Sequence, residues 1–157
     1  MFIKDLTEWR QLLEERRKEG HLSYQALARQ TNMSLSIAHN ALTGQSNSRF
    51  ENMLRLTHAS GLQAVMHCPR KGYGRSPARE QNYVLSGTDQ MRTVYRAECR
   101  RRGISCKEII VIGNLGQCTV YNFFGTGATE QYRSSTFFGL LRGASFSLDV
   151  SDISGKG

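Results

Sequence analysis

Apolar residues recur every three or four positions through most of the chain, a pattern typical of short amphipathic helices. In the first half, the pattern predicts a helix over residues 7–19, a second capped by Ser23, a third capped by Ser34, and a fourth that carries Phe50 and ends at Gly61. Serine favours the capping positions because its hydroxyl accepts a hydrogen bond from a free backbone N–H of the first turn. Four short helices, each with one apolar face, indicate a small helical unit.

The period of the pattern changes after Gly61, and the following residues favour β-structure. Residues 62–68 form one strand-like run, which Pro69 ends, and residues 146–150 form another. Each strand alone would expose an unpaired edge, so we expect the two strands to pair antiparallel with each other. The run 83–85 fits either an extra strand or a segment that anchors a linker.

The second half of the chain repeats the first half at an offset of 82 residues. The stretch 34–44 returns as 116–126, with small or polar residues first and then apolar residues on one helical face. This apolar face comprises Ile37, Ala38, Ala41 and Leu42 in the first copy, and Val120, Phe123 and Phe124 in the second. Past the third helix the offset becomes about 84, which aligns residues 53–54 with 137–138.

Capping and turn residues coincide between the two halves as well. Ser23 aligns with Ser105, Asn32 with Asn114, and Asn40 with Asn122. Two unrelated helical bundles would share apolar periodicity but not these polar positions, so the sequence predicts an internal duplication.

The sequence therefore predicts a mainly α fold of two tandem four-helix units, each followed by a short strand. The first unit with its strand covers residues 1–68, and the second covers residues 88–150. Between them, residues 69–87 contain both prolines of the chain and its highest density of basic residues, which indicates an exposed linker. Residues 151–157 are expected to form a flexible tail.

The composition narrows the class of protein. The chain has 157 residues, 39% hydrophobic and 22% charged, as in folded globular proteins. No apolar run approaches the roughly 20 residues of a membrane helix, and the N-terminus lacks the pattern of a secretory signal. We expect a cytoplasmic protein with no membrane partner. The net charge of +8 favours a polyanionic partner, because Lys and Arg release counterions from phosphates.

The sequence lacks the patterns of catalytic and metal sites. The four cysteines contain no C-x-x-C pair, which predicts reduced thiols. The four histidines are scattered, with His58 expected on a helix face and His67 at a strand edge. Hydrolase, phosphate-loop and zinc-protease motifs are missing. We therefore expect no enzymatic activity, no metal and no cofactor.

Residues 23–44 resemble the helix-turn-helix of the phage-repressor (Cro and lambda-repressor-like, or XRE) family. Ala28 matches the small residue that this family places midway through its second helix, whereas Asn32 replaces the usual turn glycine. The family's spaced serines and closing glycine are matched by Ser34, Ser36 and Gly44.

The second copy also resembles this family, and the two resemblances together cover roughly residues 6–66 and 88–149. In this copy Ile110 replaces the small residue and Asn114 replaces the turn glycine, while residues 117–122 stay close to the family's recognition helix. We expect Ile110 to crowd the helix crossing, so that the second unit is either somewhat opened or used differently.

The resemblance implies binding of double-stranded DNA, with the third helix of each unit in the major groove. The base-reading residues are then the outward positions of these helices: Leu35, Ser36, His39, Asn40, Gln117, Cys118, Tyr121 and Asn122. Asn and Gln can bond adenine bidentately, and apolar groups can contact the thymine methyl. Tyr121 could also stack on the sugar–phosphate backbone or pack inward.

Phosphate contacts are expected from helix N-termini and from the linker, because helix dipoles and basic side chains attract anions. The expected phosphate-contacting residues are Ser23, Gln25, Ser34, Ser105, Lys107, Arg70 and Lys71.

Together these features predict a sequence-specific transcriptional regulator, a repressor of phage or mobile-element type. One chain would form a pseudo-dimer that reads two non-identical half-sites of an imperfect inverted repeat, and a homodimer of chains would only extend that footprint. The alternative is a protein-interaction module, antitoxin-like or an antiactivator, whose helix-turn-helix units bind a protein.

Overall fold

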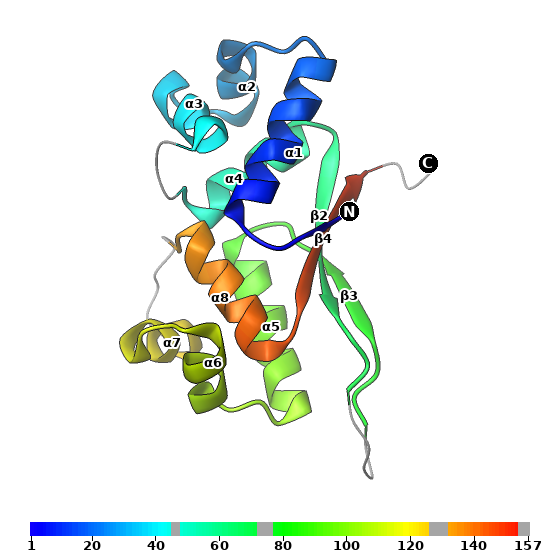
Figure 1. The fold of residues 1–157 in the computed structure, drawn as a ribbon, viewed down its shortest axis with the longest axis vertical. Helices are drawn as coiled ribbons and strands as arrows, with labels where there is room; N and C mark the ends of the chain where they lie inside the picture. Colours follow the sequence, from blue (N-terminus) through cyan, green and yellow to red (C-terminus); the bar gives the residue numbers. More distant parts are fainter. Residues whose placement is uncertain (45–47, 72–76, 126–131, 154–157) are drawn as a thin grey trace.

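The computed structural model describes residues 1–44, 48–71, 77–125 and 132–153 (Figure 1). Eight helices occur in these residues: α1 (Leu6–Glu19), α2 (Tyr24–Thr31), α3 (Leu35–Thr43), α4 (Phe50–Ala59), α5 (Thr88–Arg102), α6 (Cys106–Gly113), α7 (Gln117–Phe124) and α8 (Ser134–Ala144). Four strands accompany them: β1 (Phe2–Ile3), β2 (Leu62–Cys68), β3 (Gln81–Val84) and β4 (Ser147–Asp152). The predicted mainly helical fold with a small antiparallel sheet is confirmed.

The predicted caps and turns explain where the short helices begin and end. The hydroxyl of Ser23 accepts a hydrogen bond from the Ala26 N–H at 3.0 Å, and Ser34 and Ser105 cap α3 and α6 in the same way. Asn32 and Asn114 end α2 and α6 in the left-handed conformation, with φ values of 56° and 54°. Asparagine tolerates this conformation better than most residues.

The sheet has the order β1-β4-β2-β3, and all its neighbours are antiparallel. The expected pairing of the two strands is present, because β2 runs along β4 from Leu62 opposite Asp152 to His67 opposite Ser147. His67 therefore lies on an interior strand, and the predicted strand-edge position is wrong. The helices gather on one side of this sheet (Figure 1).

The segment 69–87 is not the open linker that its prolines and charges predicted. The chain turns back after β2, Lys71 pairs with Ala78, and β3 then runs along β2. Leu85 is completely buried, so the run 83–85 contributes both a strand and a core residue. Residues 72–76 lie outside the described part of the chain.

The expected tail begins later than predicted. Ser151 and Asp152 belong to β4, and the Ile153 N–H donates to the Gly61 carbonyl at 3.1 Å. These residues are fixed by sheet pairing rather than by core side chains, which is why their polarity misled the prediction. Residues 154–157 and Thr126, the end of the second repeated stretch, lie outside the described residues.

One aromatic cluster joins the two halves of the chain. Trp9 of α1 is fully buried, packs against Phe50 of α4 and against Phe137 and Phe138 of α8, and donates from Nε1 to the Thr57 hydroxyl at 2.9 Å. The rings of Phe50 and Phe137 lie 4.3 Å apart. Because large rings bury much apolar area, this cluster holds the halves against each other.

Helices α6 and α8 pack unusually closely. A Cβ on Gly113 would lie 2.3 Å from the Gly139 carbonyl oxygen, and a Cβ on Gly143 would lie 2.8 Å from the Ile109 Cα. The glycines let the two backbones touch, while Ile110 is only partly buried beside the core.

Two backbone pairings join residues that stand 84 positions apart in the sequence. Val65 of β2 lies opposite Asp149 of β4. Arg49 lies opposite Arg133 in an isolated antiparallel bridge, where α4 and α8 begin. Hydrogen bonds of 2.8 and 2.7 Å flank this bridge, from the Phe50 N–H to the Tyr132 carbonyl and from the Ser134 N–H to the Ser48 carbonyl.

No helix in the described part of the chain has the length and apolar character to span a bilayer.

Candidate nucleic-acid interface

Helices α3 and α7 lie on the side of the molecule away from the sheet (Figure 1). Each is the third helix of its half of the chain, and each follows a short helix, α2 or α6, against which it packs. The two helices come from segments far apart in the sequence, and the fold places both on one side.

The exposed face of α3 carries the predicted base-reading residues. Leu35 is 48% exposed, Ser36 and His39 are exposed, and Asn40 is partly exposed. The buried face is formed by Ala38, Ala41 and Leu42.

Ile37 does not join the buried face as predicted, because it is 45% exposed. Consecutive residues of a helix lie about 100° apart, so Ile37 falls beside the face centred on Ala38 and Ala41. Its side chain lines a hollow of about 230 Å³ together with Asn40 and Arg49.

The imidazole of His39 is held in place by α2. Its ring lies 4.8 Å from the Tyr24 ring, edge to face. The Tyr24 hydroxyl donates to Glu14 Oε2 at 2.7 Å, and the Arg17 guanidinium lies 4.1 Å from the Tyr24 ring centre. Burial and the bond to Glu14 raise the pKa of Tyr24. The ring that contacts His39 is therefore itself held in place by Glu14 and Arg17.

The exposed face of α7 carries the other four predicted base-reading residues. Gln117, Cys118, Tyr121 and Asn122 are all exposed, whereas Val120 and Phe123 are fully buried. Tyr121 is 51% exposed, so it points outward rather than packing inward. Its hydroxyl and ring are accessible to a partner.

The residues predicted to contact phosphate at helix N-termini are of two kinds: serines that cap a helix, and exposed side chains in the first turn. Ser23, Ser34 and Ser105 use their hydroxyls as caps. Gln25 and Lys107 are exposed in the first turns of α2 and α6.

The N-terminus of α6 is less suited to an anion than that of α2. Glu108 lies in its first turn, 3.4 Å from the Ser105 hydroxyl, where α2 has the uncharged Ala26. A carboxylate at this place repels a phosphate.

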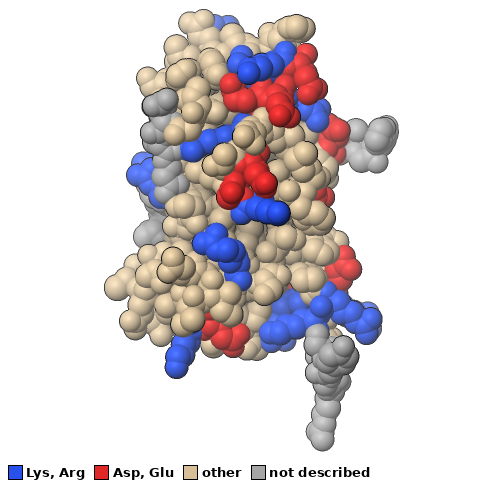
Figure 2. Space-filling model, in the orientation of Figure 1, with Lys and Arg blue, Asp and Glu red and all other residues tan. Residues whose placement is uncertain are grey.

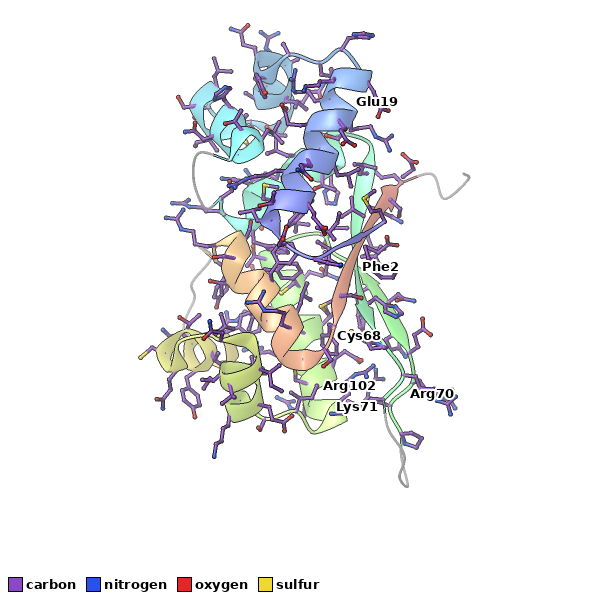
Figure 3. The ribbon with its side chains drawn as sticks, in the orientation of Figure 1. Phe2, Glu19, Cys68, Arg70, Lys71 and Arg102 are labelled. Carbon is purple, nitrogen blue, oxygen red and sulfur yellow. The ribbon has the colours of Figure 1, made fainter. Side chains whose placement is uncertain are left out.

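Arg70 and Lys71 are not brought together with α3 and α7. Lys and Arg side chains gather on the sheet side, at the base of the β2–β3 hairpin (Figure 2), and Arg70 and Lys71 lie there (Figure 3). The sequence placed them in a linker that could reach the DNA, but strand pairing holds them on the sheet side.

Two arginines that sequence reasoning missed secure the C-terminal ends of α3 and α7. Arg10 Nε donates to the Ala41 carbonyl at 2.8 Å, and burial lowers the pKa of its guanidinium. Arg92 Nε donates to the Phe123 carbonyl at 2.7 Å, and its Nη2 bonds the carbonyls of Asn122 and Gly125. Cationic groups suit helix C-termini, where carbonyls are unpaired. The offset of 82 between these arginines was the available signal.

Arg49 and Arg133 add positive charge beside α3. Both are exposed, they pair through their backbones, and they line the hollow that also contains Ile37, Asn40 and Asn52. Their positions follow from the pairing of the segments before α4 and α8, a contact with no local sequence signal.

The cysteines differ in accessibility. Cys68 and Cys99 are buried, and burial raises the pKa of each thiol to about 12. Cys106 is partly buried and Cys118 is exposed, and all four are free thiols. Within the described ranges, no group of three His, Cys, Asp or Glu residues could hold a metal ion.

Neither a protein-family model, nor a curated protein, nor a solved structure matches the chain.

Proposed function

We propose that the protein is a sequence-specific regulator of transcription that binds double-stranded DNA with α3 and α7 in neighbouring major-groove segments. The observation that carries the proposal is the presence of two equivalent helices on one side, each with an exposed polar face and an arginine at its C-terminal end. A helix fits the major groove of B-DNA and reads base edges there.

The two halves are related by a local two-fold axis in this proposal. In a two-fold arrangement, residues on the axis face their own equivalents. Val65 opposite Asp149 and Arg49 opposite Arg133 both meet this condition at the offset of 84. Two such pairs define one axis, which supports an internal pseudo-dimer.

Left-handed backbone positions give independent support for the duplication. Positive φ occurs at equivalent places in the two halves: His21 with Gly103, Asn32 with Asn114, and Gly61 with Ser145. The side chains differ within two of these pairs, so the shared feature is the backbone path rather than the residue type. A duplicated unit retains such turns because the chain must reverse there.

The expected DNA site is an imperfect inverted repeat. Asn40 and Asn122 occupy equivalent positions, whereas His39 and Tyr121 offer different groups to the partner. One half-site is therefore read differently from the other. Because Glu108 weakens the anion-binding end of α6, we expect α2 and α3 to provide the tighter half of the interaction.

A repressor of phage or mobile-element type fits this arrangement best. Such a protein acts by occupying DNA, and one chain already supplies two reading helices. A homodimer of chains would extend the protected sequence but is not needed for two-site reading.

Footprinting of DNA upstream of the protein's own reading frame tests the proposal. We expect a single chain to protect two neighbouring, non-identical half-sites about one helical turn, roughly 34 Å, apart, with affinity that falls steeply with salt. Protection of a perfect palindrome by two chains would refute the pseudo-dimer, and the lack of any specific protection would refute DNA reading.

A protein partner is the second candidate, and one observation favours it. Val111 and Ile112 of α6 are 70% and 56% exposed, where the first half has Arg29 and Gln30. Exposed apolar pairs favour protein contacts over phosphate contacts. A co-purifying protein that is lost in a Val111→Ser/Ile112→Ser variant, together with no DNA footprint, would favour an antitoxin-like or antiactivator function.

A further inference from the structure

Two arginines face each other at the base of the β2–β3 hairpin. Cys68 pairs with Gln81 and Lys71 pairs with Ala78, so the same register sets Arg70 opposite Arg79. Opposite residues of an antiparallel pair project from the same face, and like charges there destabilise the pair. Both arginines line one hollow of about 630 Å³.

The charge of this pair is only partly balanced by its surroundings. Within residues 1–44, 48–71, 77–125 and 132–153, neither guanidinium has a hydrogen-bond or ion-pair partner. Glu80 contributes one carboxylate to the same hollow, where it lies 3.5 Å from His67 Nδ1, against two guanidiniums. The carboxylate of Glu98 is already bound by Arg101, Arg102 and the Tyr83 hydroxyl.

A buried arginine fixes the backbone that carries the pair. Arg102 donates to the carbonyls of Pro69 at 2.6 Å, Arg79 at 2.9 Å and Cys68 at 3.3 Å, while its Nε donates to Glu98. Its side chain is 1% exposed. The base of the hairpin is therefore tied to α5, and its backbone requires little ordering when an anion binds.

The arginine pair lies on the opposite side of the molecule from the recognition helices. Figure 1 shows α3 and α7 on one side and the hairpin on the other, and Figure 3 places Arg70 and Lys71 at the hairpin. A duplex in contact with α3 and α7 would not reach this site.

We propose that Arg70 and Arg79 bind the phosphate backbone of a second DNA duplex, so that one chain bridges two DNA segments. The planar guanidinium matches phosphate oxygens bidentately. Among the residues that the structure describes, the hollow is otherwise lined by Pro77, Ala78 and Glu80, none of which is a large apolar or aromatic anchor of the kind that protein interfaces require. The bridging part of this inference rests on the proposed function of α3 and α7.

A capture assay tests the bridge. Operator DNA is immobilised on beads, the full-length protein is bound, and a labelled duplex of unrelated sequence is added at several salt concentrations. We expect the wild-type protein to retain the labelled duplex. The Arg70→Gln/Arg79→Gln variant should bind the operator normally but retain the second duplex on the order of tenfold less. The slope of log affinity for the second duplex against log salt concentration should be shallower by about 2.

The matched control removes two arginines elsewhere. Arg16→Gln/Arg55→Gln makes the same change in net charge at one partly exposed and one exposed position and should retain the second duplex as well as wild type. Thermal unfolding at low salt checks folding: loss of the opposed charges should leave Tm unchanged or higher in Arg70→Gln/Arg79→Gln.

The outcomes separate this inference from the proposed function. Operator binding without capture of a second duplex overturns the bridge and leaves the operator reading intact. An equal loss of operator binding in Arg70→Gln/Arg79→Gln also overturns it, because the arginines would then contact the same duplex. If the operator is not recognised, arginine-dependent binding of the unrelated duplex in solution supports the phosphate site alone. Retention of labelled poly-glutamate that is tighter than retention of the labelled duplex, and equally dependent on Arg70 and Arg79, would assign the site to an acidic protein and overturn the inference.

Discussion

Arg10 and Arg92 make the same hydrogen bond in the two halves of the molecule. Their Nε atoms donate to the carbonyls of Ala41 and Phe123, at 2.8 and 2.7 Å. Both donors and both acceptors are 82 residues apart in the sequence. Each arginine thereby fixes the C-terminal end of a candidate recognition helix to the first helix of its half. Orientation of these helices depends on this contact, because only a few buried residues anchor each of them.

Arg92→Ala tests the importance of that contact. The change removes charged hydrogen bonds to three carbonyls, so we expect the free energy of unfolding to fall by about 1–3 kcal/mol. DNA affinity should fall by more than the smaller folded fraction alone would cause, because α7 loses its orientation. Urea unfolding and fluorescence anisotropy measure the two effects. Arg100→Ala, an exposed arginine of the same helix, should change stability by less than about 0.5 kcal/mol; equal effects of the two changes would contradict this role.

Asn40→Ala and Asn122→Ala test base reading. Each change should reduce specific DNA affinity by about 1–3 kcal/mol and relax the preference at one base pair, because a bidentate contact to adenine is lost. Binding to unrelated DNA should stay the same. Titrations with operators substituted at single positions reveal the loss. Unchanged specific affinity in both variants would show that α3 and α7 are not the reading elements.

The sequence pattern predicted the features that depend on residue type and spacing. Capping by Ser23, the left-handed turn at Asn32 and the pairing of β2 with β4 all follow from spacing, residue type or the need to cover an edge. The outward positions of α3 and α7 followed from helical period alone. The cap, the turn and the outward positions require no knowledge of distant contacts, and the strand pairing was inferred from the match between the two halves.

Other features depend on partners that the sequence does not place. Strand β1 has two residues, and its pairing with β4 is completed by the Met1 amino group, which bonds the Asp149 carboxylate at 2.6 Å. The return of the chain through β3 depends on Arg102, whose side chain holds the carbonyls at the hairpin base. For this reason, the sequence pattern predicted a linker at Arg70 and Lys71 instead of a paired hairpin.

Gly113→Ala tests the close contact between α6 and α8. An added Cβ would lie 2.3 Å from the Gly139 carbonyl oxygen, so the helices must separate, at an expected cost of about 1–3 kcal/mol. Thermal unfolding should show a lower Tm. Gly20→Ala is the control, because its nearest contact would be an ordinary 3.5 Å and its φ is −85°. A Tm for Gly113→Ala as high as that of the control would mean that the helices are farther apart.

Alkaline pH should destabilise the fold through Cys68 and Cys99. Burial raises the pKa of each thiol to about 12 in the folded state, whereas in the unfolded chain a thiol ionises near pH 8.5–9, its ordinary range. Their contribution to stability is complete below that range and is lost as pH rises toward about 12. The expected slope is up to about 1.4 kcal/mol per pH unit for each thiol. Urea unfolding between pH 8 and 11 measures it. Cys68→Ala/Cys99→Ala should be less stable overall but flatter with pH, and an equally steep slope would contradict the assignment.

Thiol labelling connects these cysteines to DNA binding. At neutral pH a maleimide should modify exposed Cys118 fastest and partly buried Cys106 more slowly, while Cys68 and Cys99 react only after unfolding. Cys118 lies on the exposed face of α7 near its N-terminus, and Cys106 begins α6. The two thiols therefore report on different surfaces of one folded protein.

Operator DNA should protect Cys118 from the maleimide if α7 enters the major groove. A helix in the groove places its N-terminal residues against the base edges, where a reagent of maleimide size has no access. We expect at least a roughly tenfold slower reaction of Cys118 in the complex, and a smaller decrease at Cys106, which lies between Ser105 and Lys107 at the N-terminus of α6. Mass spectrometry of the digested protein follows both sites over time.

Asn40→Ala should weaken the complex and restore labelling at limiting DNA, whereas a duplex without the operator should protect only at low salt. Cys118 labelled at the same rate in a saturated operator complex would exclude α7 from the groove and leave α3 as the only candidate reading helix.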